Sequence, residues 1–234
     1  MAEGTRIRVV TYNIHRGRGL DGLDRLDRII DVLREVDADI VALQEVLAPH
    51  AQGLAKASGM HVVFGPTRLL ADRPYGNLCL SRFPLVAHES YSLTCRPFEP
   101  RGCLRADVDH GGGRLHVFNV HLGLRYRERI HQVRMLSRIL NHGTLGGPRL
   151  LVGDFNEWFN GRASRLLRAE FGHPCGRRRS ARTHPSVFPV FPLDRIYHDP
   201  GFGVERVVVH RSRLARVASD HLPTYADLRL APSG

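Results

Sequence analysis

The feature that most constrains this chain is a series of short apolar runs, each ending in a residue that can bind a metal or move a proton. VVTYN ends in Asn13, IVALQE ends in Glu45 and VFNVH ends in His121. LLVGDFN places Asp154 and Asn156 in the same way. One strand-end Asn or Asp is usually a turn residue. Strand ends of one compact sheet system can converge, however, so the ordered set predicts one site.

Two later motifs extend the series toward the end of the chain. FPLDRIY places Asp194 just before an expected strand, and ASDHLP places Asp220 and His221 just before the last one. Residues with metal-ligand and acid–base chemistry therefore recur from residue 13 to residue 221, which a scatter of surface acids would not produce.

The apolar runs predict a chain of many strands and few helices. Most of the expected strands are rich in Val, Ile and Leu and are bounded by Gly, Pro, Asp or Asn. They are Ile7–Tyr12, Ile40–Leu43, His61–Phe64, Leu78–Ser81, Leu85–His88, Leu104–Val108, Leu115–Val120, Leu150–Gly153, Arg195–Tyr197, Val204–Val209 and Thr224–Leu230.

Helical spacing of Leu, Ile and Val predicts one helix over residues 23–33 and another over residues 130–140. Asp21 or Asp24 is the expected N-cap of the first helix. The Pro-rich stretch His184–Pro192 is expected to be a long loop, because its prolines forbid a central strand. Two sheets packed face to face with helices outside fit this pattern. A single domain over residues 1–234 is expected.

Several classes of protein are excluded or disfavoured by the sequence. No apolar run approaches the roughly 18–20 residues that a membrane span requires. The first eight residues carry no apolar core of a signal peptide, so a cleaved secretory signal is not expected. The four cysteines show no C-x-x-C spacing and are expected to be reduced thiols in a cytoplasmic protein.

The formal net charge of +11 indicates an anionic partner but does not identify it. Lys56 is the only lysine among 34 basic residues, and an arginine excess of this kind is typical of GC-rich coding bias. The one dense basic run, Arg177–Arg179 followed by Arg182, is interpreted as a solvated surface rather than a dedicated phosphate contact.

The motifs TYNIH, LQE, YGN, LSRFP, NVHL, GDFN, LDRIY and SDH, in this order, resemble the endonuclease/exonuclease/phosphatase superfamily. This superfamily includes deoxyribonuclease-I-like nucleases, abasic-site endonucleases, neutral sphingomyelinases and inositol polyphosphate 5-phosphatases. The resemblance runs from about residue 6 to residue 230. It implies an α/β (α+β) fold of the deoxyribonuclease-I-like type, a four-layer sandwich of two packed mixed β-sheets flanked by helices. It also implies hydrolysis of phosphoesters that depends on Mg²⁺, with Mn²⁺ as a substitute.

The resemblance also implies which residues hold the metal. Asn13 and Glu45 match the positions that bind or orient it, and Asp220 resembles the acid beside it. Carboxylate and amide oxygens are hard ligands that suit Mg²⁺. The sequence contains no histidine or cysteine cluster with zinc spacing.

The remaining matched residues imply the catalytic roles. Asp154 matches the residue that orients or deprotonates the attacking water, and Asn156 matches one that helps to hold the phosphate. His121 and His221 match phosphate-contacting histidines. Asp194 matches the carboxylate partner of His221, a pairing that favours the protonated ring.

Further residues are weaker candidates. Asn77 in YGN and Arg101 in EPRG match positions that commonly contact phosphate or substrate. Thr183 and His184 either face the pocket or stabilise a turn. For three aromatic residues, packing is the preferred interpretation: core packing for Trp158, and packing against the sheets for Phe188 and Phe191.

Two departures from the family pattern bear on the substrate. Abasic-site endonucleases carry an acid where this chain has His15 and a tyrosine where it has His121, so DNA repair at abasic sites is disfavoured. The preferred interpretation is a monomeric Mg²⁺-dependent hydrolase of phosphoesters, either a phosphodiesterase or a phosphatase, with phospholipid headgroups or other small phosphodiesters as candidate substrates. A DNA or RNA nuclease is the alternative, supported by the basic charge but not favoured. A catalytically inactive phosphate-binding module is the third hypothesis.

Overall fold

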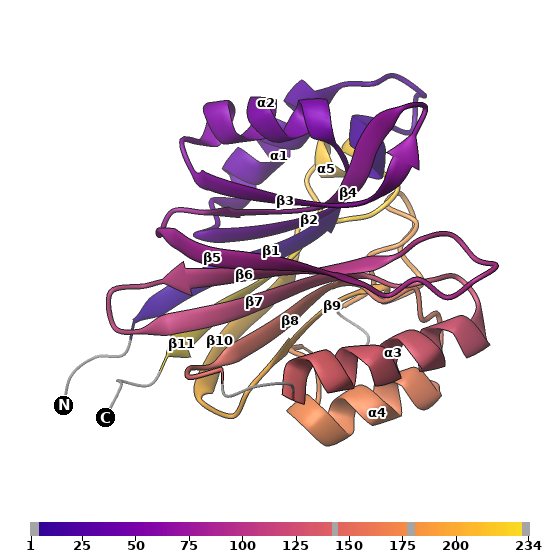
Figure 1. The fold of residues 1–234 in the computed structure, drawn as a ribbon. Helices are drawn as coiled ribbons and strands as arrows, with labels where there is room; N and C mark the ends of the chain where they lie inside the picture. The colour runs from indigo at the N-terminus through magenta and orange to yellow at the C-terminus, as the bar shows by residue number, and fades with distance from the viewer. Residues whose placement is uncertain (1–4, 142–144, 177–180, 231–234) are drawn as a thin grey trace.

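Two mixed β-sheets pack face to face at the centre of this computed structural model, which describes residues 5–141, 145–176 and 181–230 (Figure 1). The six-stranded sheet has the order β10 (Phe202–Val209), β11 (Thr224–Leu230), β1 (Arg6–Asn13), β2 (Ile40–Leu47), β4 (Arg73–Ser81) and β3 (His61–Leu70). The five-stranded sheet has the order β5 (Leu85–Ser92), β6 (Gly102–Asp109), β7 (Arg114–His121), β8 (Arg149–Asp154) and β9 (Asp194–His198).

Helices cover the outer face of each sheet and complete four layers (Figure 1). The six-stranded sheet carries α1 (Leu26–Val36), α2 (Ala48–Ser58) and the short α5 (Ala215–Ala218). The five-stranded sheet carries α3 (Tyr126–Asn141) and α4 (Arg162–Phe171). A 3₁₀ turn, η1 (His15–Gly17), follows β1. The structure therefore confirms the four-layer sandwich, and each expected strand lies within one of the observed strands.

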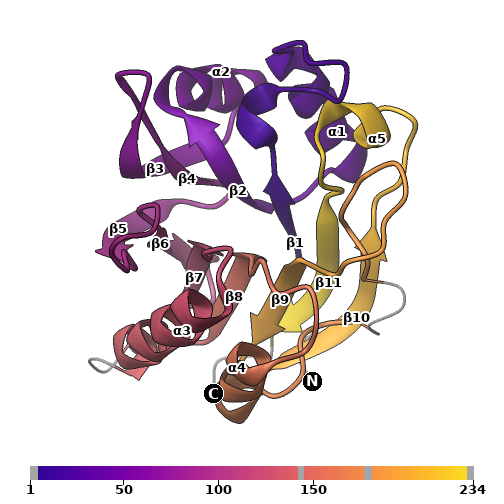
Figure 2. The ribbon, with the colours of Figure 1, turned by 90° about the vertical axis from the view of Figure 1, so that its right-hand side faces the viewer.

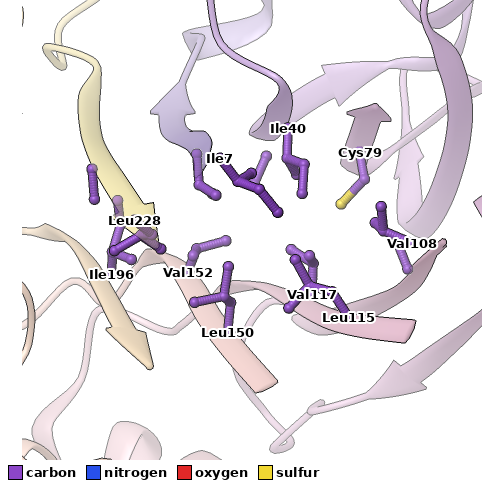
Figure 3. Packing of buried hydrophobic residues seen from close by; sticks show 14 of the residues in the cluster. Ile7, Ile40, Cys79, Val108, Leu115, Val117, Leu150, Val152, Ile196 and Leu228 are labelled. Atoms are coloured by element: carbon purple, nitrogen blue, oxygen red, sulfur yellow. The ribbon is translucent and has the colours of Figure 1, made fainter. Parts of the chain in front are cut away.

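The period-two alternation of each strand divides its apolar side chains between two cores. On β1, Ile7 and Val9 face the opposite sheet, whereas Val10 and Tyr12 face the helices. The core between the sheets also contains Ile40, and Figure 3 shows side chains from both sheets meeting there. Burial of both faces explains why these strands read as nearly continuous apolar runs.

Toward one end of the sandwich, the side chains between the sheets become polar. The Asn119 amide on β7 donates to the carbonyls of Leu43 at 2.9 Å and Leu78 at 3.0 Å, and the Gln44 amide donates to Asn119 Oδ1 at 2.7 Å. Asn119 therefore ties one sheet to two strands of the other. We call this group the inter-sheet polar layer; its members are Thr11, Gln44, Asn77 and Asn119.

The helix predictions were only partly correct. The first helix begins at Leu26 rather than residue 23, and its N-cap, Arg25, makes no side-chain cap hydrogen bond. Asp21 does not cap the helix; its carboxylate instead forms an ion pair with Arg28 at 2.7 Å. The second predicted helix corresponds to α3, whereas α2, α4 and α5 were not predicted.

The four cysteines are free thiols, as expected. None of the helices in the described part of the chain is long and apolar enough to cross a membrane. Arg177–Arg179 lie outside the described residues, so the interpretation of the basic run stays a prediction.

Candidate active site

A cleft of about 360 Å³ opens at the end of the sandwich where the inter-sheet polar layer lies. In Figure 2 this end of the sandwich faces the viewer, with loops from both sheets in front. In Figure 1 it lies opposite the two termini. Nine of the ten predicted site residues line the cleft or contact a residue that does. Eight of these line it: Asn13, Glu45, Arg101, His121, Asp154, Asn156, Asp220 and His221.

Strand register brings three of the predicted residues together. His121 on β7 pairs with Asp154 on the parallel strand β8, and Asp154 pairs with Asp194 on β9. Since side chains at paired positions point to the same face of a sheet, all three project toward the opposite sheet. The inward position that carries Val152 deeper in the core therefore carries Asp154 at the strand end.

The GDFN segment holds Asp154 and Asn156 in a shape that depends on its glycine. Gly153 has φ +144°, and a side chain there would collide with the carbonyl of Val120 on the neighbouring strand. Asn156 has φ +48°, a region that Asn tolerates well. Its backbone N–H donates to Asp154 Oδ1 at 2.9 Å and so orients the Asp154 carboxylate. Its side-chain amide donates to the Leu122 carbonyl.

Glu45 reaches the cleft because β2 contains a bulge. The pairing of β2 with β4 slips between Leu43 and Val46, and Glu45 lies in this interval with φ +59°. The extra residue lets Gln44 face the inter-sheet polar layer while Glu45 lines the cleft, and it returns Val46 to the helix-facing core. Bulges are known to re-aim side chains beside active sites in this way.

Asn13 links the two acidic residues at the floor of the cleft. Its amide nitrogen donates to Glu45 Oε1 at 3.2 Å and to Asp154 Oδ2 at 3.1 Å, while its Oδ1 accepts from the backbone N–H of His15. One amide from the six-stranded sheet thus fixes carboxylates from both sheets. The position and orientation of all three groups depend on how the two sheets are packed.

His221 and Asp194 form a buried pair, as the resemblance implied. His221 Nδ1 lies 2.8 Å from Asp194 Oδ2, and the other ring nitrogen lies 3.7 Å from Asp154 Oδ2. Burial alone would lower the pKa of His221, but the charge of Asp194, followed by that of Asp154, raises the pKa to about 10. The ring is therefore protonated at neutral pH, with one N–H held by Asp194 and the other directed toward Asp154.

Asp154 has the electrostatic environment of a proton acceptor. Burial is the largest influence and raises its pKa; the His221 charge opposes this, and the Asp194 charge adds to it, so that the pKa lies at about 6. A carboxylate with this pKa is ionised at neutral pH and is a stronger base than an ordinary aspartate.

His121 and Arg101 make up the opposite wall. Arg101 Nη1 lies 3.2 Å from both ring nitrogens of His121, and His121 Nε2 lies 3.6 Å from Asp154 Oδ2. Burial, followed by the Arg101 charge, lowers the pKa of His121 well below its ordinary value. His121 is therefore neutral, and the positive charge of this wall resides on Arg101.

Asp220 lies closer to solvent than the other acids. Its Oδ1 accepts a hydrogen bond from Ser219 and lies 3.9 Å from His15 Nδ1. The ring of His184 lies 4.8 Å from that of His221 and lines the cleft. The pocket-facing interpretation of His184 is therefore confirmed, while Thr183 is fully buried and accepts from the Asp194 backbone N–H.

Two groups of side chains bring potential metal-ligand atoms together, although the protonated ring of His221, which belongs to both groups, has no free lone pair for a cation. One consists of the buried Asp154, Asp194 and His221, and the other of His184, Asp220 and His221; within each group the ligand atoms lie within 4.8 Å of one another. Glu45 belongs to neither group. Its carboxylate accepts from the Asn13 amide at 3.2 Å and lines the cleft.

Asn77 does not line the cleft. Its amide donates to the carbonyls of Gly102 at 3.2 Å and Asn119 at 3.0 Å, so it is a member of the inter-sheet polar layer. Its side chain holds the two sheets together behind Arg101, and a role in contacting substrate stays a prediction.

The aromatic residues differ from the preferred sequence interpretation. Trp158 is 46% exposed and lines the cleft instead of packing in the core. Phe188 is 75% exposed, and Phe191 contacts Trp158 in a tilted arrangement with ring centroids 4.6 Å apart.

The cleft also contains residues that were not singled out as site residues. Arg16, Arg68 and Tyr75 line it, and burial followed by the Glu45 charge raises the pKa of the Tyr75 hydroxyl. Arg68 and Tyr75 lie on paired strands, β3 and β4, with the guanidinium 4.9 Å from the ring centroid. Tyr75 is the first residue of the YGN motif but was assigned no role there, and no motif marked Arg16 or Arg68.

Comparison with known proteins agrees with the fold and the motifs. The model of the Endonuclease/Exonuclease/phosphatase family matches residues 10–221. The uncharacterized protein YbhP of Escherichia coli (strain K12) is 32% identical over 247 residues, covering 95% of this chain and 96% of YbhP. The crystal structure of an endonuclease/exonuclease/phosphatase from Beutenbergia cavernae is similar, with 26% identity, TM-score 0.79, and 97% and 72% coverage of the two chains. A mannosyl-6-phosphatase of Bacteroides thetaiotaomicron shares the fold, with 20% identity, TM-score 0.80, and 95% and 99% coverage.

Proposed function

Because the chain belongs to the endonuclease/exonuclease/phosphatase family, we propose that it is a Mg²⁺-dependent hydrolase of phosphoesters. The observation that carries this proposal is the environment of Asp154, which is buried between a hydrogen-bond donor, Asn13, and a cationic ring, His221. A buried base beside fixed positive groups is what hydrolysis of an anionic ester by water requires.

The residues divide between activating the water and stabilising charge on the phosphate. Asp154 orients the attacking water and accepts its proton, since its pKa of about 6 lies close to neutrality. His221 donates its free N–H to a phosphoryl oxygen, and Asp194 holds the ring in position. Arg101 supplies a second fixed positive charge at the opposite wall, because His121 beside it is neutral.

The oxygen donors around Glu45 suit a hard divalent cation. Glu45, Asn13 and Asp220 would hold Mg²⁺, and they would keep several of its waters exposed in the open cleft. When bound there, Mg²⁺ supplies Lewis-acid stabilisation of negative charge on a phosphate oxygen. The basic wall and the acidic floor then act on opposite sides of one phosphate.

The test is turnover of bis-p-nitrophenyl phosphate and p-nitrophenyl phosphate with Mg²⁺, Mn²⁺, Zn²⁺ or EDTA. We expect activity with Mg²⁺ or Mn²⁺, none with EDTA, and none above background with Zn²⁺. Asp154→Asn should abolish most of it, whereas Asp31→Asn, on the exposed face of α1, should not. Absence of metal-dependent turnover on every phosphoester would instead favour a phosphate-binding module.

The substrate class needs a panel that contains plasmid DNA, a lysophospholipid and an inositol phosphate. Three arginines at the cleft, Arg16, Arg68 and Arg101, favour a phosphate of any origin. We propose small phosphodiesters, including phospholipid headgroups, as substrates of a monomeric cytoplasmic enzyme. Nuclease activity is the second candidate, supported by the net charge of +11.

A further inference from the structure

Large apolar side chains that face solvent gather at the mouth of the cleft. Among the described residues, the two most exposed large hydrophobic side chains are Phe188 (75%) and Phe159 (71%), and both lie within a few positions of residues that line the cleft, His184 and Trp158. We call six of them the apolar rim: Leu124, Tyr126, Trp158, Phe159, Val187 and Phe188.

The apolar rim is built to keep these side chains exposed. Phe191 lies beneath the aromatic pair, with its ring centroid 4.6 Å from Trp158 and 6.1 Å from Phe159. His184 and Phe191 form a β-bridge that closes the loop between them, and Phe188 belongs to this loop. Ring contacts and the β-bridge therefore hold these loops in place with apolar side chains facing solvent, whereas unconstrained loops would bury such side chains.

The apolar rim is continuous with the candidate active site. Leu124 and Trp158 line the cleft together with Asn156 and His184. Phe159 and Phe188 lie outside the cleft lining. A surface that binds the apolar rim would therefore bring its phosphate groups to the cleft without filling it.

Positive charge is interleaved with the apolar rim. Arg125 and Arg127 are exposed on either side of Tyr126, and neither side chain forms a hydrogen bond or ion pair with another described residue. Arg216 donates to the carbonyl of Val187 at 3.1 Å, which places a third guanidinium beside the Phe188 loop. Apolar loop tips flanked by arginines are complementary to a layer of acyl chains beneath anionic headgroups.

We propose that the apolar rim docks the protein onto a membrane surface rich in anionic phospholipid, with the cleft facing the headgroups. Nucleic acid fits this surface less well, because Leu124 and Val187 offer no ring on which a base could stack. The aliphatic residues instead match a hydrocarbon layer, as the exposed rings do. Docking goes beyond hydrolysis and does not depend on it.

The experiment is co-sedimentation of the full chain with vesicles of phosphatidylcholine alone or of phosphatidylcholine with phosphatidylglycerol. We expect binding to the anionic vesicles that is at least tenfold stronger than to the neutral ones. Phe159→Ser combined with Phe188→Ser should weaken it by tenfold or more. Val86→Ser, at a position on β5 that is 46% exposed and outside the apolar rim, is the control and should bind normally.

Arg125→Gln combined with Arg127→Gln tests the charge separately and should remove the preference for anionic vesicles. Turnover of bis-p-nitrophenyl phosphate by every variant should equal that of the parent, because none of the four residues lines the cleft. Equal turnover also shows that the variants fold. Vesicle binding without turnover would leave docking intact and overturn only the proposed hydrolysis.

Three results would overturn the docking proposal. The first is that the protein binds neither kind of vesicle. The second is that the Phe159→Ser/Phe188→Ser variant binds vesicles as well as the parent does. The third is that this variant still binds vesicles but no longer binds a single-stranded oligonucleotide. The last result would assign the apolar rim to nucleic acid.

Discussion

His221 is the residue on which the charge balance of the site depends. It lies between two carboxylates that occupy paired positions on neighbouring strands, Asp154 and Asp194. Because its pKa is raised to about 10 in the folded protein, protonation contributes stability that is fully present below the ordinary histidine pKa. That contribution is lost as the pH rises through the folded value. The same proton is available to a phosphoryl oxygen over the neutral range.

The first prediction concerns this pair. Asp194→Asn keeps the shape but removes the charge that raises the pKa of His221, so the alkaline limb of kcat/KM against pH should move to lower pH. The rate should fall by roughly 10²-fold, the effect of disabling one preorganised donor. His221→Ala should cost a similar amount, and the double variant little more than either single variant, because the two side chains act as one unit. Multiplicative losses, or an unmoved alkaline limb in Asp194→Asn, would show that the pair is not coupled.

Glu45 is the second residue whose role can be isolated. Glu45→Gln preserves one oxygen donor and removes the charge, so the Mg²⁺ concentration for half-maximal activity should rise by about tenfold or more. A Mg²⁺ titration of activity measures this, with Glu89→Gln on β5 as the exposed control. An unchanged titration would remove Glu45 from the proposed metal ligands.

At the scale of single elements, the bulge in β2 makes a prediction about stability that is separate from catalysis. Glu45→Gly and Glu45→Val both remove the carboxylate, but only glycine accepts φ +59° freely. Urea unfolding should therefore give a free energy about 1–3 kcal/mol lower for the valine variant than for the glycine variant. Equal stabilities would mean that β2 relaxes to a regular strand at little cost.

Strands were predictable because each carries a long apolar segment with a clear boundary. On β7 and β8 the apolar run is followed closely by the polar residue that ends it, which is His121 on β7 and Asp154 on β8. The bulge was not predictable, because LQE contains no residue that demands a positive φ. The place of Glu45 at a strand end was predicted from the apolar run before it, whereas its role toward a metal was inferred from the resemblance.

Helices and loops were less predictable. The pattern in α2, which begins with an alanine and a proline, is too weak to signal an apolar face. The exposure of Trp158 depends on Phe191, which lies 33 positions later in the sequence (191 − 158) and supports the ring only after folding. Similarly, Asn77 follows a family motif but bonds across the sheets, which only the packing of β4 against β7 reveals.

At the scale of the whole molecule, the inter-sheet polar layer sets how the two sheets align. Asn119→Leu has similar volume but removes the donor to two buried carbonyls. It also removes one of the three acceptors of the Gln44 amide. We expect it to lower the free energy of unfolding by about 2–4 kcal/mol, since each buried group left unsatisfied costs about 1–3 kcal/mol. Asn141→Leu, at an exposed site on α3, should change it by about 0.5 kcal/mol or less. Urea unfolding compares the two, and equal effects would show that Asn119 carries no special stabilisation.

The net charge of +11 gives a prediction about nucleic acid. Several arginines among the described residues are paired with carboxylates, as in Arg8–Asp227 and Arg149–Asp199, which reduces the positive charge that they offer to a polyanion. DNA binding should be weak and lost by moderate salt. A salt titration that releases six or more counterions, by the usual slope of about 0.9 per phosphate contact, would contradict this and promote the nuclease candidate.

The pairing of β1 with β11 has a consequence for how the protein is made. β1 is the first strand of the chain and β11 the last, and they lie side by side in the centre of the six-stranded sheet. The whole five-stranded sheet, by contrast, comes from one continuous stretch between them. During synthesis on the ribosome, one edge of β1 therefore stays unpaired until almost every other described element has been synthesised. Asp220 and His221 immediately precede the strand that covers that edge, so the last residues of the candidate site are synthesised together with the strand that completes the sheet.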